Sequence, residues 1–178
     1  MKIHILANNS LDESTLRIDD ADMAGADIFL FRTSSQLTLA ANLRLYASRG
    51  DATDLVANPF GWSIVSAKLR DKIWNYSHGV DFFDAPIYEK DSMRQISGYY
   101  LMHVRNIVDC LDEERSTIRY FRNGRRMGIY EYALNTEGIP ADVHIFAIPD
   151  SNDVFFKDDA AQSLRGAGIR GVAFIETL

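Results

Sequence analysis

Residues 62–83 restrict the fold strongly because they contain three ordered signals: a strand, the start of a helix and a second strand. Ile64 and Val65 are β-branched residues that favour a strand. Ser66 follows them and suits the N-cap position, since its hydroxyl can accept a hydrogen bond from an otherwise unpaired backbone N–H. Two apolar residues then recur at helical spacing, Leu69 and Ile73. With the apolar run at 80–83, the segment predicts a strand–helix–strand unit.

The last part of the chain has a similar pattern. Residues 154–156 predict a strand, and Asp158 takes the N-cap position that Ser66 has in the first unit. Gly166 and Gly168 are expected to end the helix, and residues 171–175 predict a final strand. The sequence identity between the two units is weak. The pattern therefore leaves open whether they are a duplication or two ordinary strand–helix–strand units.

The remaining segments predict a chain rich in strands. Bulky apolar runs predict strands at 1–7, 27–32, 99–104 and 143–148, and period-two alternation predicts another at 37–45. A helix also fits 99–111, but the aromatic and β-branched content favours a strand there. Polar composition predicts connections at 8–25, 50–61 and 87–97.

One hairpin is predicted by its turn. Asn123 and Gly124 separate strand-like residues 117–122 from 125–134, and this dipeptide is typical of a type I′ turn. Together these segments predict an α+β fold with a mixed or mainly antiparallel sheet and a few short helices. We expect one domain over residues 1–178, with two similar strand–helix–strand lobes, 1–90 and 91–178, as a possible subdivision.

Composition excludes several classes of protein. The formal net charge of −6 argues against nucleic-acid binding and is compatible with a basic protein partner. No apolar run approaches membrane-spanning length, and the run at 1–7 is too short for a signal peptide. Cys110 is the only cysteine, so no intramolecular disulfide forms. We therefore expect a cytoplasmic protein that binds no membrane and no nucleic acid; its oligomeric state is left open.

The sequence contains no recognisable catalytic or metal-binding constellation. The four histidines have neither the i, i+4 spacing nor the accompanying CxxC of a zinc site. No serine lies in a G-x-S-x-G motif, and the acidic neighbours of Cys110 favour an unreactive buried thiol. We therefore expect no catalytic residue, no metal and no cofactor. The alternative is a small carboxylate-dependent hydrolase acting on a modification or small ligand, because many carboxylates could form an acid pair.

Four groups of residues occur in an order that resembles a bacterial immunity-protein family encoded beside polymorphic toxins and formerly described as a domain of unknown function. They are Ile64 to Ser66, Tyr99 to Leu101 with Asp109 and Ser116, His144 to Phe146, and Gly171 to Phe174. The resemblance covers roughly residues 54–178. It implies a protein that binds a cognate toxin and neutralises it by stoichiometric complex formation. It also implies that these motif residues determine the fold rather than catalyse a reaction.

Two charged clusters are candidates for partner binding. Asp112, Glu113 and Glu114 follow an apolar strand at a turn, so we expect them to be exposed and to suit a basic toxin surface. Arg122 and Arg125 flank the predicted hairpin turn, where a basic contact loop is the corresponding hypothesis. A solvated surface without a partner is the ordinary interpretation of both clusters.

Overall fold

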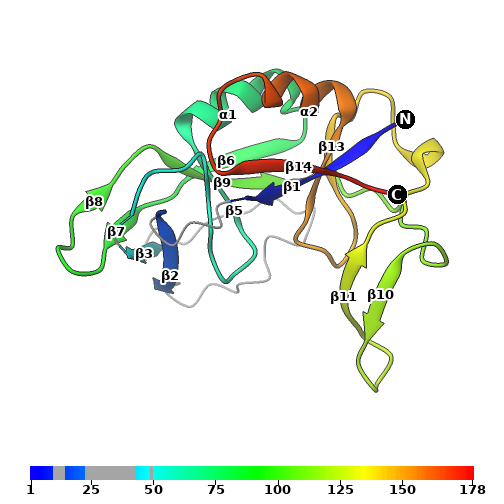
Figure 1. The fold of residues 1–178 in the computed structure, drawn as a ribbon, viewed down its shortest axis with the longest axis horizontal. Helices are drawn as coiled ribbons and strands as arrows, with labels where there is room; N and C mark the ends of the chain where they lie inside the picture. The colour runs from blue at the N-terminus through cyan, green and yellow to red at the C-terminus, as the bar shows by residue number, and fades with distance from the viewer. Residues whose placement is uncertain (10–14, 23–42, 49) are drawn as a thin grey trace.

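The computed structural model describes residues 1–9, 15–22, 43–48 and 50–178 (Figure 1). The described helical segments are α1 (Ala67–Ile73), η2 (Trp74–Tyr76), η3 (Thr136–Gly138) and α2 (Asp158–Arg165). The described strands are β1 (Ile3–Asn8), β2 (Arg17–Asp22), β3 (Arg44–Ser48), β4 (Leu55–Val56), β5 (Ser63–Ser66), β6 (Val80–Asp84), β7 (Ile87–Glu89), β8 (Gln95–Ile96), β9 (Tyr99–Val104), β10 (Thr117–Tyr120), β11 (Arg126–Glu131), β12 (Ile145–Ala147), β13 (Val154–Lys157) and β14 (Val172–Glu176).

The strands form four sheets within the described residues. Two four-stranded sheets have the orders β4-β5-β9-β6 and β12-β13-β1-β14, a third has the order β2-β3-β7-β8, and β10 pairs with β11 alone. The named strands pair antiparallel except for β3 and β7, which run parallel. The expected α+β fold with mixed, mainly antiparallel sheets and short helices is confirmed.

The two sheets that carry helices share one topology. In each, a helix connects two strands that flank a central antiparallel strand: α1 connects β5 to β6 around β9, and α2 connects β13 to β14 around β1. A short outer strand, β4 or β12, completes each sheet. The central strand follows its unit in the first sheet but begins the chain in the second. Each sheet thus takes a strand from the other half of the sequence, and the division into lobes at residue 90 stays a prediction.

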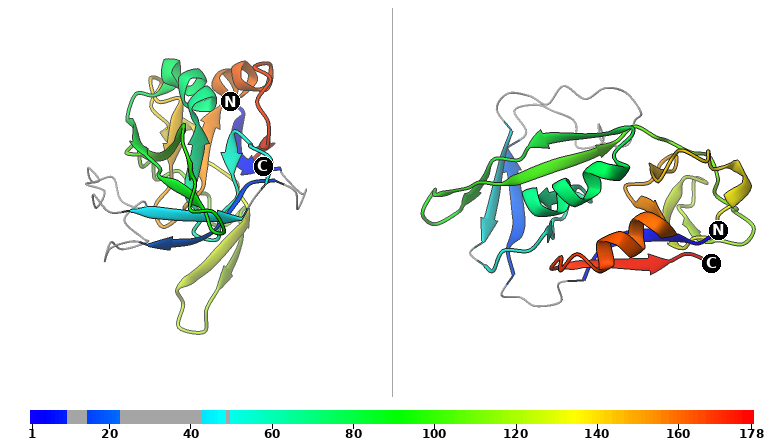
Figure 2. Two further views of the ribbon diagram at one scale, coloured as in Figure 1. Left: turned by 90° about the vertical axis from the view of Figure 1, so that its left-hand side faces the viewer. Right: turned by 90° about the horizontal axis from the view of Figure 1, so that it is seen from above.

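Both helices lie on the same face of these sheets (Figures 1 and 2). Side chains from α1, α2 and both sheets form one buried cluster, which includes Leu69, Ile73, Phe156 and Leu164. The sheet β2-β3-β7-β8 packs on the opposite face of the first sheet through a second cluster around Leu45 and Leu101. A third cluster around Phe146 and Phe155 lies beside the end of β11.

The predicted start of α1 is confirmed, whereas that of α2 is shifted. The Ser66 hydroxyl accepts a hydrogen bond from the Leu69 N–H at 3.1 Å, as expected of an N-cap. The cap of α2 is Lys157, which has no capping side-chain bond, and Asp158 is the first helical residue. The Asp158 carboxylate instead accepts a hydrogen bond from His4, and this tertiary partner was not visible in the sequence.

Several predicted connections contain strands. β2 lies within 8–25, β4 within 50–61, and β7 and β8 within 87–97. Pairing with neighbouring strands outweighs the polar composition of these segments, and Ile18 of β2 and Ile87 of β7 are fully buried. The helical alternative for 99–111 is wrong, because β9 occupies 99–104. The predicted strand at 27–32 and residues 37–42 of that predicted at 37–45 lie outside the described residues. Of the rest, Arg44 and Leu45 belong to β3, which continues to Ser48.

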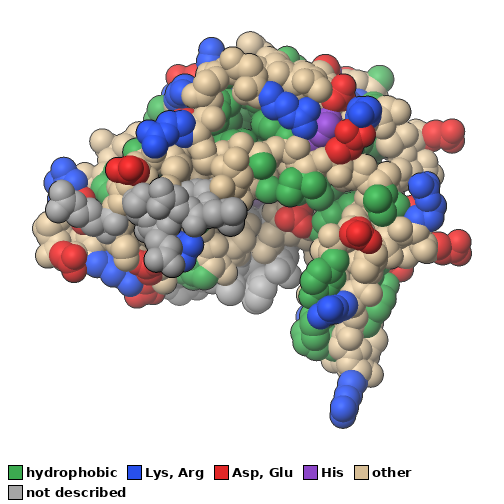
Figure 3. Space-filling model, in the orientation of Figure 1, with side chains coloured by type: hydrophobic (Ala, Val, Ile, Leu, Met, Phe, Trp, Pro, Cys, Tyr) green, Lys and Arg blue, Asp and Glu red, His purple; other side chains and the backbone are tan. Residues whose placement is uncertain are grey.

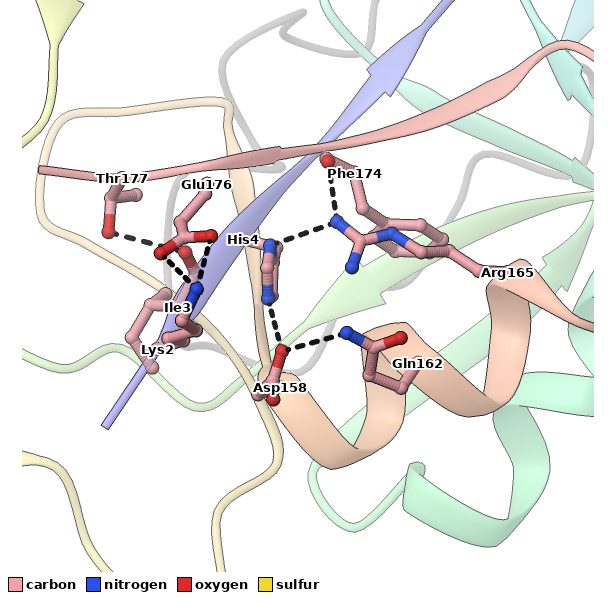
Figure 4. Close-up of polar contacts among 9 residues, drawn as sticks. All are labelled: Lys2, Ile3, His4, Asp158, Gln162, Arg165, Phe174, Glu176 and Thr177. Atoms are coloured by element: carbon pink, nitrogen blue, oxygen red, sulfur yellow. Dashed lines mark hydrogen bonds and ion pairs between the residues drawn. The ribbon is translucent and has the colours of Figure 1, made fainter.

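A buried histidine joins the first strand to the last helix and strand (Figure 4). Arg165 Nη2 donates to His4 Nδ1 at 3.1 Å and to the Phe174 carbonyl at 2.8 Å. Because arginine can only donate, Nδ1 accepts and the Nε2–H donates to Asp158 Oδ1 at 2.7 Å. Both ring nitrogens are thus used in holding β1, α2 and β14 together, which indicates a structural histidine.

Candidate functional site

A two-stranded hairpin projects from the body of the protein (Figures 1 and 3). We call residues 117–131, which comprise β10, β11 and their turn, the arm. Within the described residues its two strands pair only with each other. Two-stranded hairpins have little stability of their own, so the arm depends on the contacts at its base.

The turn of the arm differs from the predicted type I′ turn. That turn requires positive φ at both central residues, but Gly124 alone has positive φ here, at 79°. The Gly124 N–H donates to the Phe121 carbonyl at 3.0 Å, and the Phe121 N–H donates to the Arg125 carbonyl at 2.8 Å. These bonds close a three-residue loop with glycine in the left-handed region, a common hairpin connection. The predicted hairpin is therefore confirmed with a longer loop.

The base of the arm is fixed to the second sheet by Tyr132. Its ring packs edge-on against Phe155, with centroids 5.1 Å apart, and its hydroxyl hydrogen-bonds to Asp153 and lies 3.2 Å from Ser151 Oγ. Burial raises the pKa of the Tyr132 hydroxyl, and the negative charge of Asp153 raises it further. Ser116 Oγ accepts a 3.0 Å hydrogen bond from the Ala133 N–H, in the segment that follows β11. We call Ser116 and Tyr132, with these contacts, the foot of the arm. The arm is thus packed firmly against the second sheet where it begins and ends.

The arm exposes large hydrophobic side chains beyond this foot. Among the described residues, four of the nine exposed large hydrophobic side chains lie on it: Tyr120, Phe121, Met127 and Tyr130, each between 50% and 59% exposed. Exposed aromatic and methionine side chains are typical of the cores of protein interfaces. The sequence analysis identified the arginines of this hairpin but missed these residues. Their signal was a strand pattern in which apolar residues occupy positions on both faces.

Arginines lie among these hydrophobic residues. Arg119 places its guanidinium 4.6 Å from the centroid of the Tyr130 ring. Gly128 pairs directly opposite Arg119 and has open space where a side chain would stand, so the long arginine can cross to the tyrosine. Arg122 and Arg125, the predicted basic contact residues, are exposed at the tip. Figure 3 shows hydrophobic and cationic side chains side by side on the arm.

The predicted acidic cluster lies in the turn that precedes the arm. Glu113 and Glu114 are exposed, whereas Asp112 is partly buried. Glu113 Oε1 lies 2.9 Å from Arg126 Nη2 of β11, and the Asp112 carboxylate accepts a hydrogen bond from the Arg115 N–H at 3.1 Å. The structure thus brings the acidic cluster and the arm together at the base of the hairpin, where arginine and backbone groups already engage two of its three carboxylates.

One groove in the described part of the chain offers little for the hydrolase alternative. It has a volume of about 810 Å³ and lies along β6 and β9. The described residues that line it include one carboxylate, Asp84, so they supply no acid pair. The His4 hydrogen bond lowers the pKa of the Asp158 carboxyl, and Lys2 lowers that of Glu176, the opposite of what a general acid requires. In the part of the chain that the structure describes, no cluster of three or more His, Cys, Asp or Glu could hold a metal.

Cys110 is a buried thiol, as predicted. Burial raises its pKa to about 11, and the nearby Asp109 contributes to the increase. A thiol with so high a pKa is a poor nucleophile at neutral pH.

Comparison with known protein families identifies the chain. The model of the immunity protein family Imm11 matches residues 9–177, nearly the whole length. The chain belongs to the Imm11 family. Membership assigns it an immunity function against a toxin, and immunity protein families are in general non-enzymatic.

Two further findings accompany the assignment to Imm11. No curated protein matches this sequence. Each helix in the described ranges is too short or too polar to cross a bilayer. The expected cytoplasmic location stays a prediction.

Proposed function

We propose that this Imm11 protein neutralises its toxin by forming a stoichiometric complex, without chemical modification of either partner. The observation that carries the proposal is the arm: a projecting hairpin that exposes aromatic, methionine and arginine side chains, which are abundant in binding hot spots. The body of the protein needs none of these side chains for its core. Family membership supports a toxin as the partner.

The proposed contact surface includes the residues that the sequence indicated. Arg122 and Arg125 lie at the tip of the arm, and Asp112, Glu113 and Glu114 lie at its base. The acidic cluster is at the edge of this surface, where Arg126 pairs with Glu113.

Titration of toxin activity separates a binding protein from an enzyme. Increasing amounts of the purified protein are added to a fixed amount of the toxin encoded beside its gene. A binding protein abolishes activity at an equivalence point near equimolar amounts, and the complex co-elutes on size exclusion. A hydrolase that inactivates the toxin would act at a small fraction of that amount and leave no complex. Failure to inhibit the toxin, and failure of co-expression to restore growth, would contradict the proposal.

A further inference from the structure

The arm differs in charge from the rest of the protein. Residues 117–131 contain four arginines and one glutamate, a net charge of +3, within a chain of net charge −6. The remaining residues therefore carry −9. Arg126 is paired with Glu113, but Arg119, Arg122 and Arg125 have no ion pair among the described residues. A cationic projection thus extends from an acidic body.

Apolar and cationic groups share the surface of the arm. Phe121 lies next to Arg122 in the turn, and Tyr130 lies beneath the Arg119 guanidinium. Arginine that stacks on an aromatic ring keeps its N–H groups available to carboxylates. A hairpin is narrow and convex, so the complementary surface is a concave one that supplies carboxylates around an apolar floor.

We infer that the arm is the primary contact of this protein and that it fits an acidic, apolar-floored depression on the toxin. This inference rests on the proposed stoichiometric complex. The charge separation also sets the direction of approach: an acidic partner is attracted to the arm and repelled by the body. The toxin surface that meets the arm is therefore acidic, although the chain as a whole is acidic and its net charge alone suggests a basic partner.

A single-stranded nucleic acid is the other partner that arginine and aromatic side chains can bind. The charge of the body argues against it, because a polyanion that extends past three arginines would meet a surface of net charge −9. The two partners remain distinguishable by experiment.

Charge reversal at the tip tests the sign of the partner surface. The double variant Arg122→Glu/Arg125→Glu should associate with the purified toxin about tenfold more slowly at low ionic strength, and its rate should depend less on salt. The matched control is Lys72→Glu/Arg170→Glu, which makes the same change in net charge at exposed positions on α1 and before β14. The control should slow association much less. Faster association of the tip variant would indicate a basic partner surface and overturn the inference.

Removal of the aromatic side chains tests the apolar floor. Phe121→Ser/Tyr130→Ser should dissociate from the toxin about tenfold or more faster, since buried aromatic anchors mainly determine off-rates. Phe121→Tyr/Tyr130→Phe keeps both rings and should retain wild-type dissociation, which separates lost contact from a misfolded arm. Trp74→Ala is the control, because Trp74 is similarly exposed but lies on η2. Weakening by Trp74→Ala, with neither arm variant affected, would place the interface elsewhere.

Binding of the wild-type protein to the toxin separates failure of the proposed function from failure of this inference. If it forms no complex with the toxin, the proposed function fails and the inference fails with it. If the wild type binds and all arm variants bind equally well, only the inference fails. A fluorescent single-stranded RNA is the final probe: tight binding that Arg122→Glu/Arg125→Glu abolishes would assign the arm to nucleic acid and overturn the inference. We expect no such binding at physiological salt.

Discussion

The side-chain nitrogen of Asn106 donates a hydrogen bond to the Ile145 carbonyl at 3.1 Å, and so joins the two helix-bearing sheets. The same nitrogen donates to the His78 carbonyl at 2.6 Å, just before β6. The backbone of Asn106 adds a third connection, since its carbonyl accepts from the Ala147 N–H at 2.9 Å. One residue in the turn after β9 therefore holds the first sheet against β12 of the second.

Gly79 lies so close to Asn106 that a substitution at Gly79 should lower the stability of the protein. A Cβ on Gly79 would stand 2.1 Å from Asn106 Oδ1, and the residue has φ of +75°. We expect Gly79→Ala to destabilise the protein by about 2–4 kcal/mol, from backbone strain plus disrupted hydrogen bonds. Gly98→Ala is the control: its φ is +85° with nothing within 4 Å, so it should cost only about 1 kcal/mol. Urea unfolding measures both, and equal losses would contradict the role of Asn106.

The Asp158 carboxylate should contribute to stability in a way that depends on pH. Its hydrogen bond from His4 lowers its pKa below the ordinary value of 3.8. The stabilisation is therefore fully present above the ordinary value and is lost as pH falls through the lower folded pKa. We expect Asp158→Asn to be less stable than wild type at neutral pH, with the difference shrinking in acid. Asp142→Asn, at an exposed position, is the control, and thermal melts across the acid range give the comparison.

Cys110 should report on opening of the fold. With a pKa of about 11, only about one thiol in a thousand is ionised at pH 8, and the side chain is 3% exposed. We expect iodoacetamide to modify the native protein far more slowly than a cysteine peptide. The rate should rise steeply in urea along with the loss of tertiary structure. Modification of the native protein at the peptide rate would show that the thiol is accessible without unfolding.

Tyr132 should matter more than Tyr130, although they are neighbours in sequence and both belong to the hairpin region. Tyr132→Phe removes the hydroxyl that hydrogen-bonds to Asp153 in a partly buried site, so we expect a loss of about 1–3 kcal/mol. Tyr130 is 59% exposed, and Tyr130→Phe should change stability by less than about 0.5 kcal/mol. Chemical unfolding of the two variants side by side tests whether the foot of the arm is fixed by this hydroxyl.

A variant of the acidic cluster distinguishes docking through that cluster, as the sequence predicts, from docking through the arm. The sequence predicts that Asp112→Asn/Glu113→Gln/Glu114→Gln slows association with a basic toxin by about tenfold at low salt. Since Arg126 already pairs with Glu113 and the arm favours an acidic partner surface, we expect the association rate to stay equal or increase. Stopped-flow kinetics at two salt concentrations decide between them. A tenfold decrease would restore the acidic cluster as the principal docking surface.

The sequence predicted helix α1 and the β10–β11 hairpin correctly. The Ser66 cap with the Leu69 and Ile73 stripe defines α1, and the Asn123–Gly124 dipeptide defines the hairpin, because each signal lies within a few residues of the structure it determines. The strands β2, β4, β7 and β8 were missed. These strands form because other strands supply their hydrogen bonds. The polar composition of a segment does not indicate which strand it will pair with.

The candidate site was predicted in part. The arginines at the tip and the carboxylates at the base were identified by charge, but the exposed aromatic residues were not. In the sequence, Tyr120 and Tyr130 resemble ordinary strand residues. Only the structure shows that no layer of the described chain covers them. The apolar residues on both faces of these strands are a local signal, but whether such a side chain faces a core or a partner depends on the packing of the remaining chain.

The placement of β1 between β13 and β14 determines the order of events during synthesis. Lys2, just before β1, forms a side-chain hydrogen bond with Glu176 of β14, and the two residues are 174 positions apart. On the ribosome, β5, α1, β6 and β9 can assemble as soon as they emerge, whereas β1 must wait unpaired until β13 and β14 are translated. A strand that is synthesised well before its partners leaves its edge exposed to other nascent chains in the meantime. Completion of this sheet therefore depends on synthesis of residues 154–176, which supply both neighbours of β1.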